Sequence, residues 1–599
     1  MKSVITVRSP PNIGQALQEA VALQQQGRLR EAEKIYARVL KAAPDQFDAL
    51  NLLGTVKLLR GQAGEAYRLI SAALKVNPRV ADVWVNLGLV LHALKRDQEA
   101  LESFDKALAL KPDDAGALNH RGNVLLGLGR PADALAAFDR VLALDPRHGE
   151  ARLNRGIALA GLERHEEAVA DFEAALAISP GNPMAHYNRG IALFSLGRYA
   201  DAVASYDRTL SVAPDHVKAL NNRGLALQAL NRHPEALASY GRAVEIQKDY
   251  ADAHFNQALA LLTIGDFRRG FEKYEWRWRR TGMPAERRAA LATPDSIRGS
   301  GQRGHSIGAR AGHSPEQGSS ARGHGRPLWL GEYPLQRKTI LLHAEQGLGD
   351  TIQFARYVPL LARAGAKVVL EVQPELVPLL ARVEGAKSVV ARGQALPAFD
   401  VHCPLGSLPL ALKTEPATIP AEIPYVTADE ARIAKWRPRI GGFDRPRVAV
   451  AWSGNVRHSN DRNRSIALSQ LAPLWSADRA RFVGIQRELR DEDARLLASE
   501  ARVTPVGAEL DDFADTAAVL ALVDLVITVD TSVAHLAGAM GRPVWILLPF
   551  SPDWRWTLEG ESSRWYPSAR LFRQPSLGDW VSVIERVSRE LDLLAQPVS

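Results

Sequence analysis

The chain has 599 residues, of which 46% are hydrophobic and 24% are charged, and its formal net charge is +8. This length is too great for one hydrophobic core, and the composition excludes a chain that is disordered throughout. The single cysteine, Cys403, excludes an internal disulfide framework and a cysteine-rich zinc site. The modest positive charge permits acidic ligands such as nucleotide diphosphates, but it does not by itself indicate nucleic-acid binding.

The N-terminal sequence lacks the apolar core of a secretory signal, and no run approaches the ~20 apolar residues that span a bilayer. One cysteine in a chain of this size also fits a reducing compartment. We therefore expect a cytoplasmic protein without a transmembrane segment.

Residues 13–284 repeat with a period of 34 residues. The same interval separates the prolines Pro44, Pro78, Pro112, Pro146, Pro180 and Pro214 and the glycines Gly54, Gly88, Gly122, Gly156, Gly190 and Gly224. This pattern resembles the tetratricopeptide repeat, in which each unit is a helix pair. Small residues lie where the two helices cross, and a proline ends the second helix. The pattern predicts an α-solenoid of about eight units, of which the last departs by carrying Ala258 and Gly270 at the two small positions.

A row of asparagines occurs two residues before the repeat glycine, and we call it the asparagine row. It comprises Asn86, Asn154, Asn188, Asn222 and Asn256 and is interrupted by Leu52 and His120. Amide side chains both donate and accept, so such a row can hold an extended peptide backbone. The row resembles the one in the O-linked N-acetylglucosamine transferases, which implies a peptide acceptor groove. The alternative is that these asparagines only satisfy neighbouring helix carbonyls.

The eighth unit ends in aromatic and basic residues. Phe271, Tyr274 and Trp278 have the spacing of one helical face, and we expect this stripe to dock the repeats onto the next domain. A nucleic-acid role for the basic, aromatic patch is the weaker alternative, and we expect no nucleic-acid partner. Residues 285–334 are predicted to be a flexible insertion, because 294–326 are rich in glycine, serine and arginine without periodicity.

Strand-like and helix-like segments alternate from residue 335 onwards. They predict two doubly wound α/β halves, 335–430 and 447–599, with 414–446 crossing between them. The strands are expected at 339–344, 367–372, near Ser388, near Val401, and at 448–452, 482–486, 525–529 and 544–548. The helices are expected at 351–364, 374–383, 469–475, 491–500, from about 532 to 540, and at 578–594.

The segment from Asp524 to Pro549 reads as strand, tight turn, helix, turn and strand. Asp530, Thr531 and Ser532 supply residues that commonly cap a helix N-terminus. Free backbone N–H groups and the helix dipole make such a turn a potential anion site. An ordinary capped helix in any α/β domain would carry the same residues, so other parts of the sequence must distinguish an anion site from a simple helix cap.

One such part is a second loop in the first half. Gly347-Leu348-Gly349-Asp350 follows the first strand, and together with Asp530-Thr531-Ser532 and His535 it resembles the two-domain (GT-B) glycosyltransferases. The closest likeness is to the heptosyltransferases (family 9), whereas the fusion with tetratricopeptide repeats resembles the O-linked N-acetylglucosamine transferases (family 41). The resemblance implies transfer of a sugar from a nucleotide-diphospho-sugar, with inversion and without a metal ion.

The resemblance also implies roles for individual residues. Asp350 matches the general base, with His343 as the weaker candidate, and a helix cap is the alternative role of Asp350. Arg464 is expected to stabilise the departing diphosphate, whereas a solvated basic loop is the alternative. The donor is expected to contact Gly347, Gly349, Ser453, Asn455, Gln486, Asp530, Thr531, Ser532 and His535. Trp554 offers either a stacking face for the ligand or a packing contact.

No metal site or resident cofactor is predicted. The acidic triplet Asp491-Glu492-Asp493 opens a predicted helix, where the helix dipole explains it, and no His/Cys cluster has metal-ligand spacing. We expect the repeats to present a protein or peptide hydroxyl to the transferase. Two alternatives remain: a scaffold with a vestigial sugar-nucleotide domain, and an enzyme that glycosylates a lipid-linked saccharide.

Overall fold

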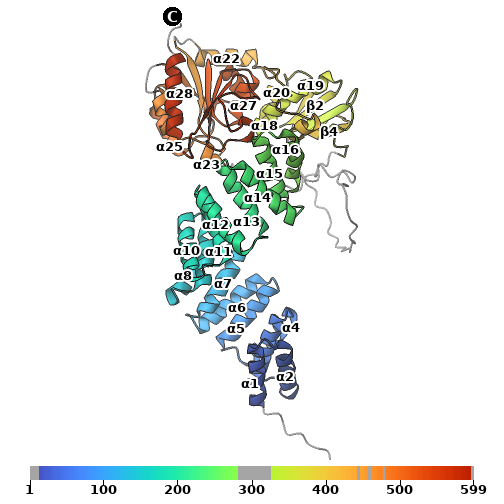
Figure 1. The fold of residues 1–599 in the computed structure, drawn as a ribbon, viewed down its shortest axis with the longest axis vertical. Helices are drawn as coiled ribbons and strands as arrows, with labels where there is room; N and C mark the ends of the chain where they lie inside the picture. The colour runs from blue at the N-terminus through green and yellow to red at the C-terminus, as the bar shows by residue number, and fades with distance from the viewer. Residues whose placement is uncertain (1–12, 281–324, 442–444, 456–459, 476–478, 595–599) are drawn as a thin grey trace, which may run out of the picture. The chain divides into compact units, whose positions relative to one another are not determined.

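The computed structural model describes residues 13–280, 325–441, 445–455, 460–475 and 479–594. The chain forms two compact units, Met1–Ala219 and Leu220–Ser599, so the boundary between them falls within the repeats rather than after them. Figure 1 shows helical repeats at the N-terminal side and two α/β layers at the C-terminal side. In the part of the chain that the structure describes, we find no helix with the length and apolar character that crossing a membrane requires.

The first unit is a stack of helix pairs. Its helices are α1 (Ile13–Gln25), α2 (Leu29–Ala42), α3 (Phe47–Leu59), α4 (Ala63–Val76), α5 (Ala81–Ala93), α6 (Asp97–Leu110), α7 (Ala115–Gly127), α8 (Pro131–Leu144), α9 (Gly149–Gly161), α10 (His165–Ile178), α11 (Pro183–Ser195) and α12 (Tyr199–Val212). The predicted helix pairs are confirmed. The first helix of each pair contacts the first helix of the next, so these helices line one side of the stack.

The repeat glycines have the packing role that the sequence predicted. A Cβ atom added at Gly88 would lie 2.6 Å from the ring of Phe104, and one at Gly156 would lie 2.6 Å from that of Phe172. Both rings are fully buried. The glycine in the first helix therefore makes room for an aromatic ring sixteen residues later, in the second helix of the same pair.

The second unit begins with the last two helix pairs. These are formed by α13 (Val217–Ala229), α14 (His233–Ile246), α15 (Ala251–Thr263) and α16 (Phe267–Tyr274), followed by the 3₁₀ turn η1 (Glu275–Arg279). Residues 281–324 lie outside the described residues, and with them lies most of the predicted flexible insertion. The prediction does not hold for 325–334, because Trp329 is buried and its backbone N–H donates to His402 O at 2.9 Å.

The first α/β half contains a four-stranded parallel sheet in the order β3-β2-β1-β4. Its strands are β1 (Thr339–His343), β2 (Lys367–Val372), β3 (Ala386–Ala391) and β4 (Val401–Pro404). The helical elements are α18 (Leu348–Phe354), η2 (Ala355–Tyr357), α19 (Val358–Arg363), η3 (Pro374–Leu376), α20 (Val377–Leu380), η4 (Leu405–Ser407) and α21 (Leu408–Ala411). Helix α22 (Glu430–Ile440) lies in the predicted crossing between the halves and pairs Arg432 with Asp512 of the second half at 2.8 Å.

The second half contains a six-stranded parallel sheet in the order β10-β9-β8-β5-β6-β7. Its strands are β5 (Arg447–Ala451), β6 (Arg481–Gly484), β7 (Val503–Pro505), β8 (Leu525–Val529), β9 (Val544–Leu548) and β10 (Ala569–Arg573). The helical elements are α23 (Asp461–Arg464), η5 (Leu468–Leu471), α24 (Ala472–Trp475), α25 (Asp491–Ser499), η6 (Gly507–Glu509), α26 (Phe513–Leu522), α27 (Ser532–Ala539), η7 (Trp554–Trp556) and α28 (Trp580–Leu594).

Three predicted helices are wrong in extent. The helix expected at 351–364 begins earlier, at Leu348, and is divided into α18 and α19 by η2. The helices expected at 374–383 and 469–475 are each a 3₁₀ turn followed by four α-helical residues. Each of the three carries a proline inside its expected range, namely Pro359, Pro374 with Pro378, and Pro473. Proline removes a backbone donor, which favours short, broken helical segments.

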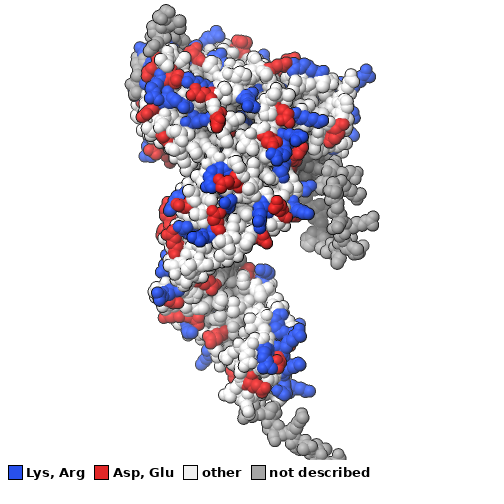
Figure 2. Space-filling model, viewed as in Figure 1, with Lys and Arg blue, Asp and Glu red and all other residues white. Residues whose placement is uncertain are grey.

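The last repeat shares one hydrophobic core with both sheets. A continuous cluster of buried side chains includes Phe267 and Phe271 of α16, Ile340 of β1 and Val526 of β8. Phe271 and Tyr274 therefore dock the last repeat onto the α/β region, as the sequence predicted, and Trp278 lies half-buried in η1. On the face displayed in Figure 2, acidic and basic side chains are interspersed over the α/β region.

Candidate functional site

The predicted site residues lie at the carboxyl ends of the parallel strands. Loops follow β1, β5, β6, β8 and β9 at this edge, which is where ligands collect in open α/β sheets. The two halves meet there, because α18 packs against α27. A Cβ atom added at Gly349 would lie 2.7 Å from His535 Cδ2 and 3.4 Å from Ser532 Cα. Glycine at position 349 thus lets the first half approach the start of α27.

Asp350 has two partners. One carboxylate oxygen accepts a hydrogen bond of 2.9 Å from the backbone N–H of Gly347, which caps the start of α18. The other pairs with the guanidinium of Arg555, from η7 of the second half. The side chain keeps 24% of its surface exposed. The alternative role of Asp350 as a helix cap is therefore present, together with an ion pair that joins the two halves.

Arg555 is the buried cation of this edge. It pairs with Asp553 at 2.9 Å as well as with Asp350, and its Nε donates to Gln353. Burial acts to lower the pKa of Arg555, but the carboxylates of Asp553 and Asp350 raise it well above its ordinary value. The guanidinium is thus a permanent positive charge between two acidic loops.

Asp530, directly after β8, is a buried carboxyl group with an unusual proton affinity. Burial and the nearby charge of Asp553 raise the pKa of Asp530 to about 6, although Trp556, Arg464 and Arg555 act in the opposite direction. Its backbone carbonyl accepts a hydrogen bond of 3.0 Å from Arg464 Nη1. The site therefore contains a carboxyl group that titrates close to neutral pH.

His535 lies one turn into α27 and is buried. Its Nδ1 is 3.0 Å from the Tyr566 hydroxyl, and its ring stacks on Trp556 with the ring centroids 5.4 Å apart. Burial and the positive charges of Arg555, Arg356 and Arg464 hold the pKa of His535 well below its ordinary value. The imidazole is therefore neutral at physiological pH.

Arg464 of α23 lies beside the loop after β5 and the end of β8. Its Nη2 would lie 2.6 Å from a Cβ added at Gly454, so the glycine lets the guanidinium pass beside the loop after β5. Its Nε is buried without a hydrogen-bond partner, and the nearest carboxylate oxygen recorded for it is that of Asp461, at 3.8 Å. Arg457 of the same basic loop lies outside the described residues.

The other predicted donor contacts differ in how they are held. Gln486 Oε1 accepts hydrogen bonds from the backbone N–H groups of Trp452 (3.3 Å) and Ser453 (3.1 Å), so its amide joins the ends of β5 and β6. Asn455 is exposed. Thr531 is the N-cap of α27, but its side chain makes no capping hydrogen bond and instead meets the Thr528 hydroxyl at 3.3 Å.

Trp554 has a packing role. Its ring forms edge contacts with Phe267 and Phe271 of the last repeat, with ring centroids 6.0 and 5.7 Å apart. His343, the weaker base candidate, is buried, and its Nε2 lies 3.2 Å from His402 Nδ1.

The asparagine row is partly bonded within the repeats. Asn86 Nδ2 donates to Asn51 (3.0 Å), and Asn256 donates in the same way to Asn221 (2.9 Å). Asn154 donates to an asparagine at a different repeat position, Asn123 (2.7 Å). Asn188 donates to the Met184 carbonyl at 2.9 Å, and Asn222 accepts from Asn221 at 3.3 Å. The side-chain carbonyl oxygens of the four asparagines that donate, Asn86, Asn154, Asn188 and Asn256, take no part in these bonds.

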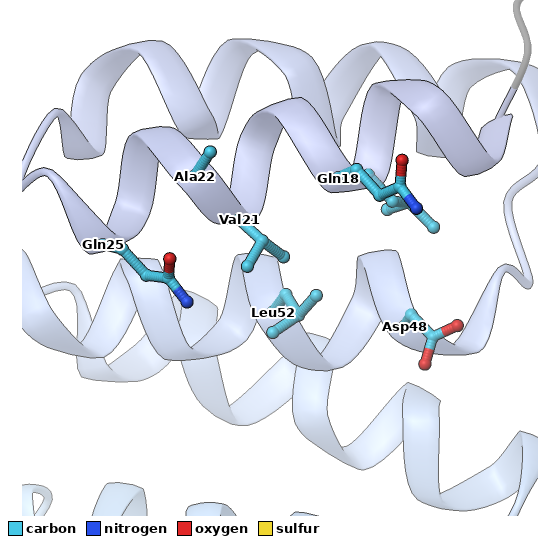
Figure 3. A pocket seen from close by; sticks show the side chains of 7 residues that line it. Gln18, Val21, Ala22, Gln25, Asp48 and Leu52 are labelled. Atoms are coloured by element: carbon cyan, nitrogen blue, oxygen red, sulfur yellow. The ribbon is translucent and has the colours of Figure 1, made fainter.

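A groove lies at the start of the first unit, between α1 and α3. It has a volume of about 360 Å³ and is lined by Leu17, Gln18, Val21, Ala22, Gln25, Asp48 and Leu52. Figure 3 shows Val21 of α1 and Leu52 of α3 pointing toward one another, with Gln25 and Asp48 toward the two ends. Leu52 is the residue that interrupts the asparagine row, so the groove offers an apolar contact at the equivalent position.

The sequence predicted that the loop 549–556 walls the ligand pocket, but it assigned no individual role to Asp553, Arg555 or Tyr566. Asp553 and Arg555 belong to the loop after β9, which carries no recognisable motif. Only the fold brings Arg555 to Asp350, which is 205 residues away in the chain. Among the described residues, no group of three or more His, Cys, Asp and Glu side chains is arranged to hold a metal ion.

Known families match two parts of the chain. Tetratricopeptide-repeat matches cover residues 17–69, 60–115, 120–183, 187–251 and 224–275, and residues 480–550 match glycosyltransferase family 9 (heptosyltransferase). The chain joins tetratricopeptide repeats to a glycosyltransferase-type region. The second match covers β6 to β9, including Asp530, Thr531, Ser532 and His535, whereas Asp350 and Arg464 lie outside it.

Protein FlbA of Caulobacter vibrioides is 28% identical over 288 residues, which are 44% of this chain and 48% of FlbA. The chain therefore spans about half the length of this curated relative. A tetratricopeptide repeat protein from Parabacteroides merdae matches with a TM-score of 0.34 and 19% identity, over 42% of this chain and 98% of that one. PilW, described as a type IV pilus biogenesis factor, matches with a TM-score of 0.33 and 27% identity, over 35% of this chain and 96% of that one.

Proposed function

We propose that the chain is a GT-B glycosyltransferase that moves a sugar from a nucleotide-diphospho-sugar to a hydroxyl of a protein or peptide. The observation that carries the proposal is the packing of Gly349 on the start of α27. It brings Gly347–Asp350 of one half beside Ser532 and His535 of the other, as a ligand held between two halves requires. The family 9 match over 480–550 supports the same chemistry.

In this proposal the donor diphosphate binds at the start of α27. The backbone N–H groups of Ser532 and Val533 belong to the first turn, where helix donors have no partner within the helix. Arg464 reaches the same turn, since it donates to the carbonyl of Asp530 at 3.0 Å. Its guanidinium supplies charged donors for a phosphate oxygen. Asn455 and Gln486, at the ends of neighbouring strands, would border the nucleoside.

Transfer proceeds by direct displacement. The acceptor oxygen forms a bond to the anomeric carbon while the bond from that carbon to the phosphate oxygen breaks, which inverts the configuration. Asp350 takes the hydroxyl proton, and the nucleoside diphosphate leaves with the electron pair. Arg464 and the start of α27 stabilise the negative charge that develops, so the proposed step requires no metal ion. Arg555 is paired with Asp350 in the structure and joins that carboxylate to the second half.

The repeats hold the acceptor. In Asn86 and Asn154 of the asparagine row, the side-chain carbonyl oxygen can accept a hydrogen bond from a peptide backbone, and the groove at Val21 and Leu52 can receive an apolar side chain. Asn231 Nδ2 donates to Phe550 O at 2.7 Å, and Ser551 Oγ donates to Gln228 O at 3.1 Å. The seventh helix pair therefore touches the loop after β9, so a peptide on the last repeats would lie near the proposed donor site.

The decisive experiment measures binding of UDP, GDP, ADP and CDP by calorimetry to the wild-type chain and to Arg464→Ala. We expect one nucleotide to bind saturably and the variant to lose roughly 100-fold in affinity. Arg495→Ala removes an exposed arginine from α25 of the same half and should bind as the wild type does. The matching sugar nucleotide is then tested for transfer to peptides. If none of the four nucleotides binds to folded protein, the proposal fails and a scaffold becomes the better explanation.

A further inference from the structure

We propose that Tyr274 and Arg277, at the end of the last repeat, are positioning residues for the loop Glu345–Asp350 of the transferase region. The proposal rests on the function proposed above, because it assigns these residues to the loop that carries the base. We call residues Glu345–Asp350 the Asp350 loop. Figure 1 shows α16 directly beside α18, which this loop opens.

The period of the repeats shows what is unusual about Tyr274. Tyr36 and Tyr240 occupy the same position in the first and seventh repeats, and each donates its hydroxyl to a glutamine twelve residues earlier, Gln24 or Gln228, at 3.1 Å. The equivalent residue for Tyr274 is Leu262, which has no polar group. The last repeat therefore lacks the internal glutamine partner, as does the sixth repeat, in which Phe194 stands twelve residues before Tyr206.

Tyr274 instead bonds to the Asp350 loop. Its hydroxyl donates to Gln346 Oε1 at 3.0 Å, and Gln346 Nε2 lies 2.7 Å from the same hydroxyl. The side chain of Tyr274 is 4% exposed. Burial, and after it the charge of Asp350, raise the pKa of Tyr274, so the hydroxyl stays protonated close to the proposed base.

The change at the glycine position fits this arrangement. In the seventh repeat, a Cβ added at Gly224 would collide with the ring of Tyr240, whereas the eighth repeat carries Ala258 at that position. The methyl group of Ala258 occupies space that the regular repeat leaves for the ring. At Gly270, the second departure of the last repeat, an added Cβ would lie 2.6 Å from Leu262 Cδ2, and Ala258, Leu262 and Tyr274 all belong to the same buried cluster.

Arg277 holds the first residue of the loop. Its Nη2 donates to Glu345 Oε1 at 3.2 Å and to Ser407 Oγ at 2.7 Å, and its Nη1 donates to Glu275 Oε1 at 2.6 Å. Glu345 Oε1 also accepts from the backbone N–H of Gly406 at 3.1 Å. Arg277 and Glu345 are both more than nine-tenths buried. One guanidinium thus joins the last repeat to the ends of β1 and β4.

The same segment contacts the other partner of Asp350. Phe267 and Phe271 pack on Trp554, the neighbour of Arg555 in η7. The last repeat therefore fixes the Asp350 loop through Tyr274 and Arg277, and the turn that carries Arg555 through Trp554. It sets the position of the carboxylate between the two halves, as a precisely oriented base requires.

The test compares Tyr274→Phe with Tyr36→Phe, which removes the same kind of tyrosine–glutamine hydrogen bond within the first unit. Hydrogen exchange of the amides in 346–351 is measured together with kcat and the KM for the sugar nucleotide. For Tyr274→Phe we expect exchange roughly fivefold faster, the change that the loss of one hydrogen bond gives. We also expect kcat to fall roughly 10- to 100-fold with KM within about twofold, because the base and not donor binding is disturbed.

Tyr36→Phe should leave all three quantities unchanged. If the amides of 346–351 exchange in Tyr274→Phe at the same rate as in the wild type, the proposal is overturned. An unchanged kcat in spite of faster exchange overturns it as well. If the wild-type chain transfers no sugar from any donor, the proposed function has failed. The exchange measurement then still decides on its own whether Tyr274 holds the loop. A second variant, Arg277→Gln, should accelerate exchange at Glu345 and Gln346, and unchanged exchange there would remove Arg277 from the proposal.

Discussion

Replacing Asp530 with asparagine should stabilise the second unit at neutral pH while weakening donor binding. Asp530 is buried, and burial with the charge of Asp553 raises the pKa of its carboxyl group from 3.8 to about 6. A raised carboxyl pKa contributes stability in acid, below about pH 4, and this contribution is lost as the pH rises through about 6. The shift corresponds to about 3 kcal/mol, at 1.36 kcal/mol for each pKa unit.

That free energy converts into a measurable shift of the melting temperature. The second unit spans Leu220–Ser599, about 380 residues, and an unfolding entropy of about 2 cal/mol/K per residue gives about 0.8 kcal/mol/K. Asp530→Asn should therefore melt about 4 °C above the wild type at pH 7.5, and the difference should disappear near pH 4. Tryptophan fluorescence follows this unit, because eleven of the twelve tryptophans belong to it.

Asp524 provides the matched control at the opposite end of β8. Its hydrogen bonds with Arg447 lower the pKa of its carboxyl group, so Asp524→Asn should be neutral or destabilising at pH 7.5. A melting temperature of Asp530→Asn at or below that of the wild type at pH 7.5 would refute the reasoning. It would mean that the buried carboxylate costs the folded state nothing.

Three further predictions concern the other parts of the site. Gly349→Ala should lower the melting temperature of the second unit, since overpacking against His535 costs about 1–3 kcal/mol. The control Gly241→Ala should not lower it, because a Cβ at this position meets nothing within 4 Å. Asp350→Asn keeps an oxygen for the Gly347 N–H but loses the charge that pairs with Arg555, so a general base would show as a loss of roughly 10²- to 10⁴-fold in kcat in protein that remains folded. If kcat is retained, Asp350 serves only as a helix cap and as the ion-pair partner of Arg555. Leu52→Glu should weaken peptide binding roughly 10- to 100-fold, as the loss of one leucine contact predicts. The control Leu59→Glu, on the exposed side of α3, should not weaken it. If both variants bind the peptide equally well, the groove is not part of the acceptor site.

The sequence predicted those features that depend on local periodicity. The 34-residue period determines where an aromatic ring meets a glycine, and this pairing recurs at Gly88 with Phe104 and at Gly156 with Phe172. The runs of β-branched residues predicted β2 and β8 with their observed bounds. The Asp350 loop and the start of α27 were expected at the carboxyl edges of two sheets, and this topology follows from the alternation of strands and helices.

Contacts between distant segments were not predictable in this way. Nothing in the sequence indicates that Arg555 bonds to Asp350, because a buried arginine and an exposed one look the same in a single sequence. The asparagine row was correctly located along the helices, but the pairing of Asn86 with Asn51 depends on how neighbouring repeats stack. The boundary of the compact units was missed for the same reason. The core that joins α16 to the sheets arises from packing, and no composition change marks it.

The polar network around Arg277 argues that the last repeat orients the transferase region rather than merely stabilising it. Burying Arg277 and Glu345 costs desolvation energy that an apolar contact would avoid, so their network with the half-buried Glu275 is weak evidence for stability. Stability at this interface is already supplied by Phe267, Phe271 and Trp554. The charged groups fix the orientation of the loop that ends in Asp350, because their hydrogen bonds hold individual atoms in place. If the interface served only to hold the two regions together, hydrophobic residues at positions 277 and 345 would suffice. Hydrogen-bonded charges at these positions are expected where the interface fixes the position of a base.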